Sequence, residues 1–344
     1  LSDRTRASGG SRLPLIVAGL VLAAIGMALM PASVSFGVGG LVATMVMLYA
    51  GINLERSPAQ VLVADMVPSR YRSLASGSVT FQMCLGAIVF LMLGRALGMR
   101  VAFTVAAVTV LLIAVAFAAG LRTPSDSSAD PDESAASLVA TLVAAVRGTL
   151  PGIRAVFLAS LLLQMTFQTF STWFALHGTE RFGVRPEDVT VAFIAWAIGG
   201  VLGALPAGAI GVGFGRRTAM LVGFGLMAAS LLALDRVPSL NAAAPLLCLA
   251  SAAWTLPAVN AYPLFVEPIP PQQRGMVSSV FLLSMAFGGA IGDPLNGAIF
   301  DAAGSYRPLF MSMAVYTALA FMAMLKVPRG AGEAVEVQRE VVKG

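Results

Sequence analysis

The chain has 344 residues, of which 58% are hydrophobic and 11% are charged, and its formal net charge is +5. Soluble domains carry about 25% charged residues, so this composition excludes a soluble protein and predicts an all-α protein embedded in the lipid bilayer. Arginine and lysine are in excess, which in a soluble protein would suggest nucleic-acid binding. In a membrane protein the excess is typical of cytoplasmic loops, and no nucleic-acid partner is expected.

Ten apolar runs follow the polar, basic opening segment 1–12. Most of them are long enough to cross about 30 Å of hydrocarbon, and their continuous character predicts membrane-spanning helices. The runs are Leu13–Met30, Phe36–Ala64, Ser73–Leu93, Val101–Ala119, Ile153–Leu176, Val189–Ile210, Thr218–Leu234, Ala242–Val266, Met276–Phe300 and Pro308–Leu325.

A polar segment divides four of these runs from the other six. We expect an incomplete N-terminal helix bundle at 1–121, a linker with a short amphipathic surface helix at 122–150, a six-helix bundle at 151–327 and a tail at 328–344. If the opening loop lies in the cytoplasm, most arginines and lysines lie there too. The linker and both termini are then cytoplasmic, in a multi-pass protein of the plasma membrane.

A short pattern of acid, proline and arginine occurs twice at one fixed separation. Asp65, Pro68 and Arg72 are each followed 202 residues later by their counterparts, Glu267, Pro270 and Arg274. A constant offset across three residue types predicts an internal duplication. Two six-run copies would make twelve helices, so ten are present and we expect the first two to be missing in front of Leu1.

These features resemble the major facilitator superfamily, which has twelve helices in two halves and a Gly-x-x-x-Asp-Arg…Gly-Arg-Arg loop after the second helix. SDR at 2–4, GGSR at 9–12 and GFGRR at 213–217 fit that loop. Within the superfamily, the stretches 58–75, 260–275 and 304–310 are most similar to sucrose–proton and glycoside–cation symporters. Plant sucrose symporters carry an arginine where this chain has Gln60.

The resemblance implies a secondary transporter that moves a small polar solute, a sugar or glycoside, by alternating access coupled to protons. It also implies that three runs line the central cavity, at 36–64, 153–176 and 242–266. Two alternatives stay open: an exporter of amphipathic compounds, and a non-transporting assembly or scaffold protein with the same fold.

Polar side chains inside the cavity-lining runs are the candidates for the solute site. Such groups are expensive in a membrane and often functional, and amides offer both donors and acceptors to sugar hydroxyls. The alternatives are a structural ion pair for Glu55 and Arg56, and helix-to-helix contacts for the amides. The candidates are Asn53, Glu55, Arg56, Gln60, Gln164, Gln168, Thr172, Trp173, Trp254 and Asn260.

Two acids in the apolar runs are candidates for proton coupling. Glu55 lies in the second run, and Asp293 lies in the ninth with Gly292 before it and Asn296 one turn later. A carboxyl group in apolar surroundings can load and release a proton. The alternative for Asp293 is a kinked, water-exposed site near the outer mouth.

Charged residues at the ends of the runs are candidates for a cytoplasmic gate that holds the halves together in one state. The alternative is that the arginines only set the topology. The residues are Asp3, Arg4, Asp65, Arg72, Arg216, Arg217, Glu267 and Arg274.

The sequence offers nothing that predicts an enzyme. Cys84 and Cys248 both fall in apolar runs, so a disulfide is not expected. The single histidine, His177, cannot form a metal site alone and is interpreted as a polar helix end. No P-loop or catalytic triad is visible in the sequence. We therefore expect no metal and no cofactor, and a monomer whose partners are solute, protons and lipid.

Overall fold

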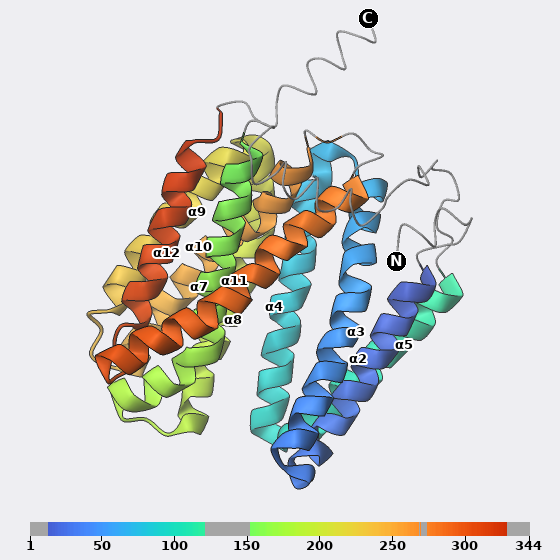
Figure 1. Cartoon of the computed structure of the whole chain (residues 1–344), viewed down its shortest axis with the longest axis vertical. Helices are drawn as coiled ribbons and strands as arrows, with labels where there is room; N and C mark the ends of the chain where they lie inside the picture. The colour runs from blue at the N-terminus through green and yellow to red at the C-terminus, as the bar shows by residue number, and fades with distance from the viewer. Residues whose placement is uncertain (1–12, 121–151, 268, 270–273, 329–344) are drawn as a thin grey trace, which may run out of the picture. The chain divides into compact units, whose positions relative to one another are not determined.

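The structure is a computed structural model that describes residues 13–120, 152–267, 269 and 274–328. Each of the ten predicted runs forms an α-helix (Figure 1). Short 3₁₀ turns, η1 (Val34–Phe36) and η2 (Ser69–Tyr71), precede the second and third helices. The helices are α2 (Leu13–Ser33), α3 (Gly37–Met66), α4 (Arg72–Leu97), α5 (Met99–Gly120), α7 (Ile153–Phe182), α8 (Pro186–Gly213), α9 (Arg216–Leu234), α10 (Leu240–Val266), α11 (Arg274–Ala303) and α12 (Leu309–Leu325).

Eight helical stretches of the described residues are long and apolar enough to cross a membrane. The first, Leu13–Arg56, contains both α2 and most of α3, and the shorter α12 is apolar as well. The prediction of an all-α multi-pass membrane protein is therefore confirmed. The predicted linker helix within 122–150 and residues 329–344 of the tail lie outside the described residues.

Several helices continue past the ends of the apolar runs. The largest extension is in α7, which runs six residues beyond Leu176 to Phe182. Gly183 ends it in the left-handed conformation, with φ of 62°, as is common after a helix. The length of an apolar run reflects the thickness of the hydrocarbon layer, whereas a helix continues until its backbone is interrupted. A helix can therefore extend beyond the apolar run that it contains.

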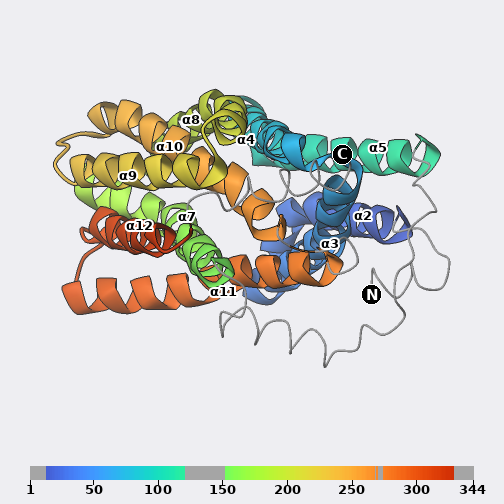
Figure 2. The same ribbon diagram turned by 90° about the horizontal axis from the view of Figure 1, so that it is seen from above.

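The chain forms two compact units. One contains α2, α3 and α5 with the end of α4 from Val89, and the other contains α4 up to Ile88, α7 to α10, α12 and most of α11. In the second unit α12 packs beside α7 and α9 (Figure 2). This division differs from the predicted boundary at residues 122–150, which stays a prediction.

Close helix contacts in both units rely on glycine. A Cβ atom added to Gly51 in α3 would lie 2.4 Å from the backbone nitrogen of Ala23 in α2. A Cβ on Gly199 in α8 would lie 2.0 Å from the carbonyl oxygen of Cys248 in α10. Small residues of this kind let membrane helices approach each other closely.

Candidate functional site

A cluster of polar contacts inside the second unit joins α7 to α11. Gln168 donates its amide N–H to Oδ2 of Asp293 over 3.2 Å, and Thr172 donates its hydroxyl to the same oxygen over 3.3 Å. Gln168 also donates to the Thr172 hydroxyl over 3.1 Å. The structure thus brings together one predicted coupling acid and two predicted solute-site residues.

The backbones of α7 and α11 approach closely at this place. A Cβ atom on Gly288 would lie 2.5 Å from the carbonyl oxygen of Leu161 and 2.8 Å from Cβ of Gln164. A Cβ atom on Gly292 would lie 3.3 Å from Cα of Met165. Because the helices are this close, the short side chains of Asp293 and Thr172 can reach each other.

Both donors use one oxygen of the Asp293 carboxylate. Its other oxygen, Oδ1, is buried and has no hydrogen-bond partner in the part of the chain that the structure describes. Buried polar atoms without a partner are rare in proteins, and they often mark a place for water, an ion or a ligand. Oδ1 is therefore a candidate acceptor for a water molecule or a ligand.

One helical turn further along α11, Asn296 makes a second link to α7. Its side chain is fully buried, and its amide nitrogen donates to the Thr169 hydroxyl over 2.8 Å and to the Gly292 carbonyl over 2.7 Å. This link fixes α11 against α7 beside Asp293. Sequence reasoning noted Asn296 only as a neighbour of the acid.

Aromatic rings lie beside this polar cluster. The ring of Trp173, the residue after Thr172, is 3.5 Å from the position of a Cβ on Gly297, which is one turn from Asp293. Trp173 also contacts Phe300 at a centroid distance of 5.2 Å and Tyr306 at 6.0 Å. Its indole N–H is buried without a partner among the described residues.

Two other predicted solute-site residues are deeply packed. Trp254 in α10 is 6% exposed and stacks on Phe167 of α7 at 5.2 Å. Asn260 is fully buried, and its amide nitrogen donates to the carbonyls of Ala207 in α8 and Leu256 in its own helix. The contacts of Asn260 favour a role in joining α8 to α10.

The α3 candidates belong to the other compact unit. Glu55 is half-buried where α3 crosses α2, opposite Gly19, whose added Cβ would lie 2.8 Å from the Glu55 Cβ. Asn53 is exposed and donates to the Tyr49 carbonyl over 2.8 Å, and Arg56 is exposed too. Asp3 and Arg4 lie outside the described residues, and so do the side chains of Gln60, Asp65 and Arg274.

A buried ion pair is the best defined of the predicted gate contacts. Nη1 of Arg216 at the start of α9 lies 2.5 Å from Oε2 of Glu267 after α10, and these side chains are 8% and 9% exposed. Arg216 also donates to the Ser69 carbonyl over 2.6 Å and to the Ser73 hydroxyl over 3.1 Å. Ser69 in turn donates its hydroxyl to Glu267 over 3.0 Å.

The neighbouring predicted gate arginines have different partners. Arg217 donates to the carbonyls of Leu325 over 3.3 Å, the last residue of α12, and of Val327 over 2.7 Å, just after the helix, where helix carbonyls lack partners within the helix. Arg72, at the start of α4, is 5% exposed and donates to the Val67 carbonyl over 3.2 Å. Arg217 therefore caps a helix, whereas Arg216 links α4, α9 and α10.

Comparison with known proteins now identifies the family. The profile of the Major Facilitator Superfamily matches residues 1–185 and, in a second match, residues 156–342. The chain belongs to the major facilitator superfamily. A member of this superfamily is a membrane transporter, so the expectation of a protein that is not an enzyme is confirmed. No curated protein sequence matches the chain.

Solved structures of the superfamily share this fold. The Escherichia coli fucose:proton symporter FucP matches with a TM-score of 0.69 and 16% identity over 94% of this chain and 85% of that chain. The human organic anion transporter MFSD10 matches with 0.72 and 21% over 94% and 80%. The proton:xylose symporter XylE matches with 0.69 and 15% over 96% and 83%.

Proposed function

We propose that the protein is a secondary transporter that moves a sugar or glycoside by alternating access, coupled to protons. The observation that carries this proposal is the contact of Asp293 with Gln168 and Thr172 on two facing helices. A carboxylate, an amide and a hydroxyl supply the mixed donors and acceptors that a polyhydroxylated solute requires. Trp173 beside them offers a flat apolar face for a sugar ring.

Asp293 also suits the role of the coupling acid. Ionisable side chains inside membrane helices are rare, expensive and often functional, and Asp293 lies within an apolar helix next to two proposed solute-site residues. A proton on Oδ1 would neutralise the carboxyl group while Oδ2 keeps both of its donors. Glu55, on α3 of the other unit, is the second candidate for this role.

The Arg216–Glu267 pair is proposed as part of the cytoplasmic gate. Through Ser69 and Ser73 it ties the start of α4 to α9 and α10, and such a link can stabilise one state of an alternating carrier. If the arginine only set the topology, it would not need three polar partners from separate segments. Asp3, Arg4, Asp65, Arg72 and Arg274 complete the proposed gate.

The structural neighbours support both transport candidates. Two of them are a fucose:proton and a proton:xylose symporter, and one is an organic anion transporter. The second candidate function, export of amphipathic compounds, is favoured by the aromatic cluster of Trp173, Phe300 and Tyr306 beside the carboxylate. In either case we propose a monomer in the plasma membrane, with the linker and termini in the cytoplasm.

The test is an uptake assay on the full-length protein in proteoliposomes, with and without a proton gradient. The solutes are sucrose, methyl glucoside, D-xylose, L-fucose and one amphipathic cation. Asp293→Asn is expected to abolish the stimulation of uptake by the gradient. Asp301→Asn changes an exposed acid of the same helix and is expected to leave the stimulation intact. Gradient-driven uptake that survives in both Asp293→Asn and Glu55→Gln would contradict the coupling proposal.

A further inference from the structure

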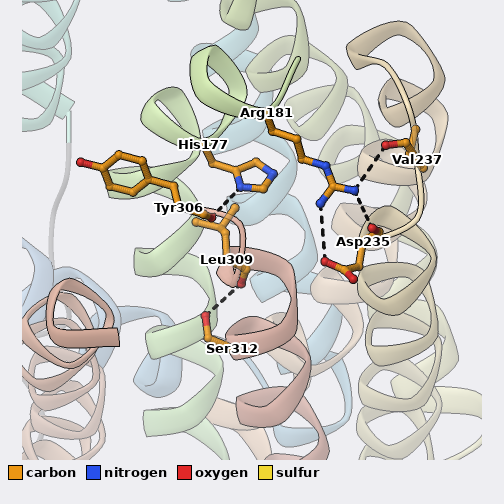
Figure 3. Close-up of polar contacts among 7 residues, drawn as sticks. All are labelled: His177, Arg181, Asp235, Val237, Tyr306, Leu309 and Ser312. Carbon is orange, nitrogen blue, oxygen red and sulfur yellow. Dashed lines mark hydrogen bonds and ion pairs between the residues drawn. The ribbon is translucent and has the colours of Figure 1, made fainter. Parts of the chain in front are cut away.

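The end of α7 next to the solute site carries polar groups that the proposed function does not use. His177 and Glu180 follow Trp173 at spacings of four and seven residues, so the three side chains share one face of the helix. The loop between α11 and α12 lies over this face (Figure 3).

Both backbone polar groups of Tyr306 are bound by α7. Its carbonyl accepts a hydrogen bond from Nδ1 of His177 over 2.7 Å, and its N–H donates to Oε2 of Glu180 over 2.9 Å. A carbonyl can only accept, so the proton of the neutral imidazole must lie on Nδ1. His177 is fully buried and Glu180 is exposed, so the histidine is expected to make the stronger of the two contacts.

The surroundings of His177 keep it in this position. Its ring contacts Phe174, Phe182 and Phe310, the closest at a centroid distance of 4.9 Å. Its other nitrogen, Nε2, is buried without a partner among the described residues. The carbonyl of Tyr306 is therefore the polar contact that orients the ring.

The side chain of Tyr306 continues toward the solute site. Its ring packs on Trp173 at a centroid distance of 6.0 Å and on Phe300 at 5.5 Å. Trp173 in turn lies over Gly297, one turn from Asp293. A continuous set of contacts thus runs from His177 through Tyr306 to Trp173.

We propose that His177 and Glu180 are positioning residues of the transporter: they hold Tyr306 so that its ring fixes Trp173 beside Asp293. This inference rests on the proposed function, because it assigns Trp173 to the solute site. If Tyr306 is released, the Trp173 ring loses one of its two aromatic neighbours outside α7. The site then becomes more open and binds the solute less well.

The first experiment follows Trp173 directly and requires no transport. Trp196→Phe and Trp254→Phe leave Trp173 as the single tryptophan of the 344-residue sequence, and both replaced rings stack on phenylalanines. The probe is acrylamide, which quenches the fluorescence of accessible tryptophan side chains. His177→Leu is expected to increase the quenching constant of Trp173. In His177→Gln, which keeps an N–H donor, the quenching constant is expected to lie between the values of wild type and His177→Leu. Glu180→Leu is expected to increase the quenching constant less than His177→Leu does.

Arg181 provides the matched control at the same end of α7. It pairs with Asp235 at 3.5 Å and donates to the carbonyls of Asp235 and Val237 (Figure 3). Arg181→Leu removes these contacts to the loop between α9 and α10 without touching Tyr306. It is expected to lower the melting temperature and to leave the quenching of Trp173 unchanged. The same quenching increase in Arg181→Leu and His177→Leu would overturn the proposal.

The second experiment measures uptake of the solute that the wild-type protein transports best in the panel above. His177→Leu is expected to raise KM about fivefold, which corresponds to about 1 kcal/mol, with little change in the maximal rate. A lower maximal rate at unchanged KM would contradict a positioning role. If the wild-type protein transports no solute of the panel, the proposed function fails, whereas the quenching result still decides whether the histidine positions Trp173.

Discussion

Removal of the Glu267 charge should destabilise the protein far more than removal of an exposed charge. In the structure Glu267 accepts from Arg216 and Ser69, and the two charged side chains are less than one-tenth exposed. Glu267→Leu leaves the Arg216 guanidinium buried without its carboxylate, which typically costs about 3–5 kcal/mol. Glu267→Gln keeps an oxygen acceptor but loses the charge, and about 1.5–3 kcal/mol is expected.

The measurement is thermal unfolding of the full-length protein in detergent, compared with a reversible denaturant titration. Arg185→Gln is the control, because Arg185 pairs with Glu187 at 3.3 Å and Asp188 at 3.2 Å but is 72% exposed. The hydrogen bond with Asp188 raises the pKa of Arg185, so the control residue is charged like Arg216. Arg185→Gln is expected to leave the midpoint unchanged.

A double variant tests whether the two buried charges act on each other. Arg216→Met combined with Glu267→Leu should lower the free energy of unfolding by less than the sum of the two single changes. The difference should be about 0.5–3 kcal/mol, because neither charge is left without its partner. Additive effects would show that the pair does not interact as described. A Glu267→Leu protein as stable as the Arg185→Gln control would refute the reasoning altogether.

Three further changes test other contacts. Gly199→Ala should lower the free energy of unfolding by about 1–3 kcal/mol, because the added methyl group meets the Cys248 backbone. The control is Gly225→Ala, where the nearest atom to the added Cβ is 3.8 Å away, and this change should be neutral or slightly stabilising. Arg217→Leu should cost about 1–3 kcal/mol in the same assay, because two carbonyls at the end of α12 lose a charged donor; a stability equal to wild type would contradict the capping role. Thr172→Val should weaken solute binding several-fold in the uptake assay, and an unchanged KM would remove Thr172 from the site.

The fold could be predicted from the sequence because bilayer-spanning helices must be long and apolar. The start of α4 at Arg72 and that of α11 at Arg274 are 202 residues apart, the same offset as in the repeated pattern. The helix ends were less predictable. The polar end of α7, which carries His177 and Glu180, extends beyond the apolar run.

The site was predicted as separate residues rather than as a cluster. Asp293, Gln168 and Thr172 each stand out as polar groups in apolar runs, but their contact depends on the approach of two backbones at Gly288. The role of His177 could not be predicted, because its partner is a backbone carbonyl and leaves no mark in the sequence. Arg216 and Arg217 are adjacent, yet neighbouring positions of a helix point about 100° apart, so the two side chains have unrelated partners.

The attachment of α4 within the second unit has a mechanical consequence. The helix has no proline between Arg72 and Leu97, and its first part, up to Ile88, belongs to the same unit as Arg216. This part is held by the hydrogen bond between Ser73 and Arg216 and by a close backbone contact with α8, where a Cβ atom on Gly77 would lie 2.7 Å from the Ala204 carbonyl oxygen. A displacement of Arg216 would therefore act on an unbroken helix that also packs on α8, and so reach beyond the direct partners of the arginine.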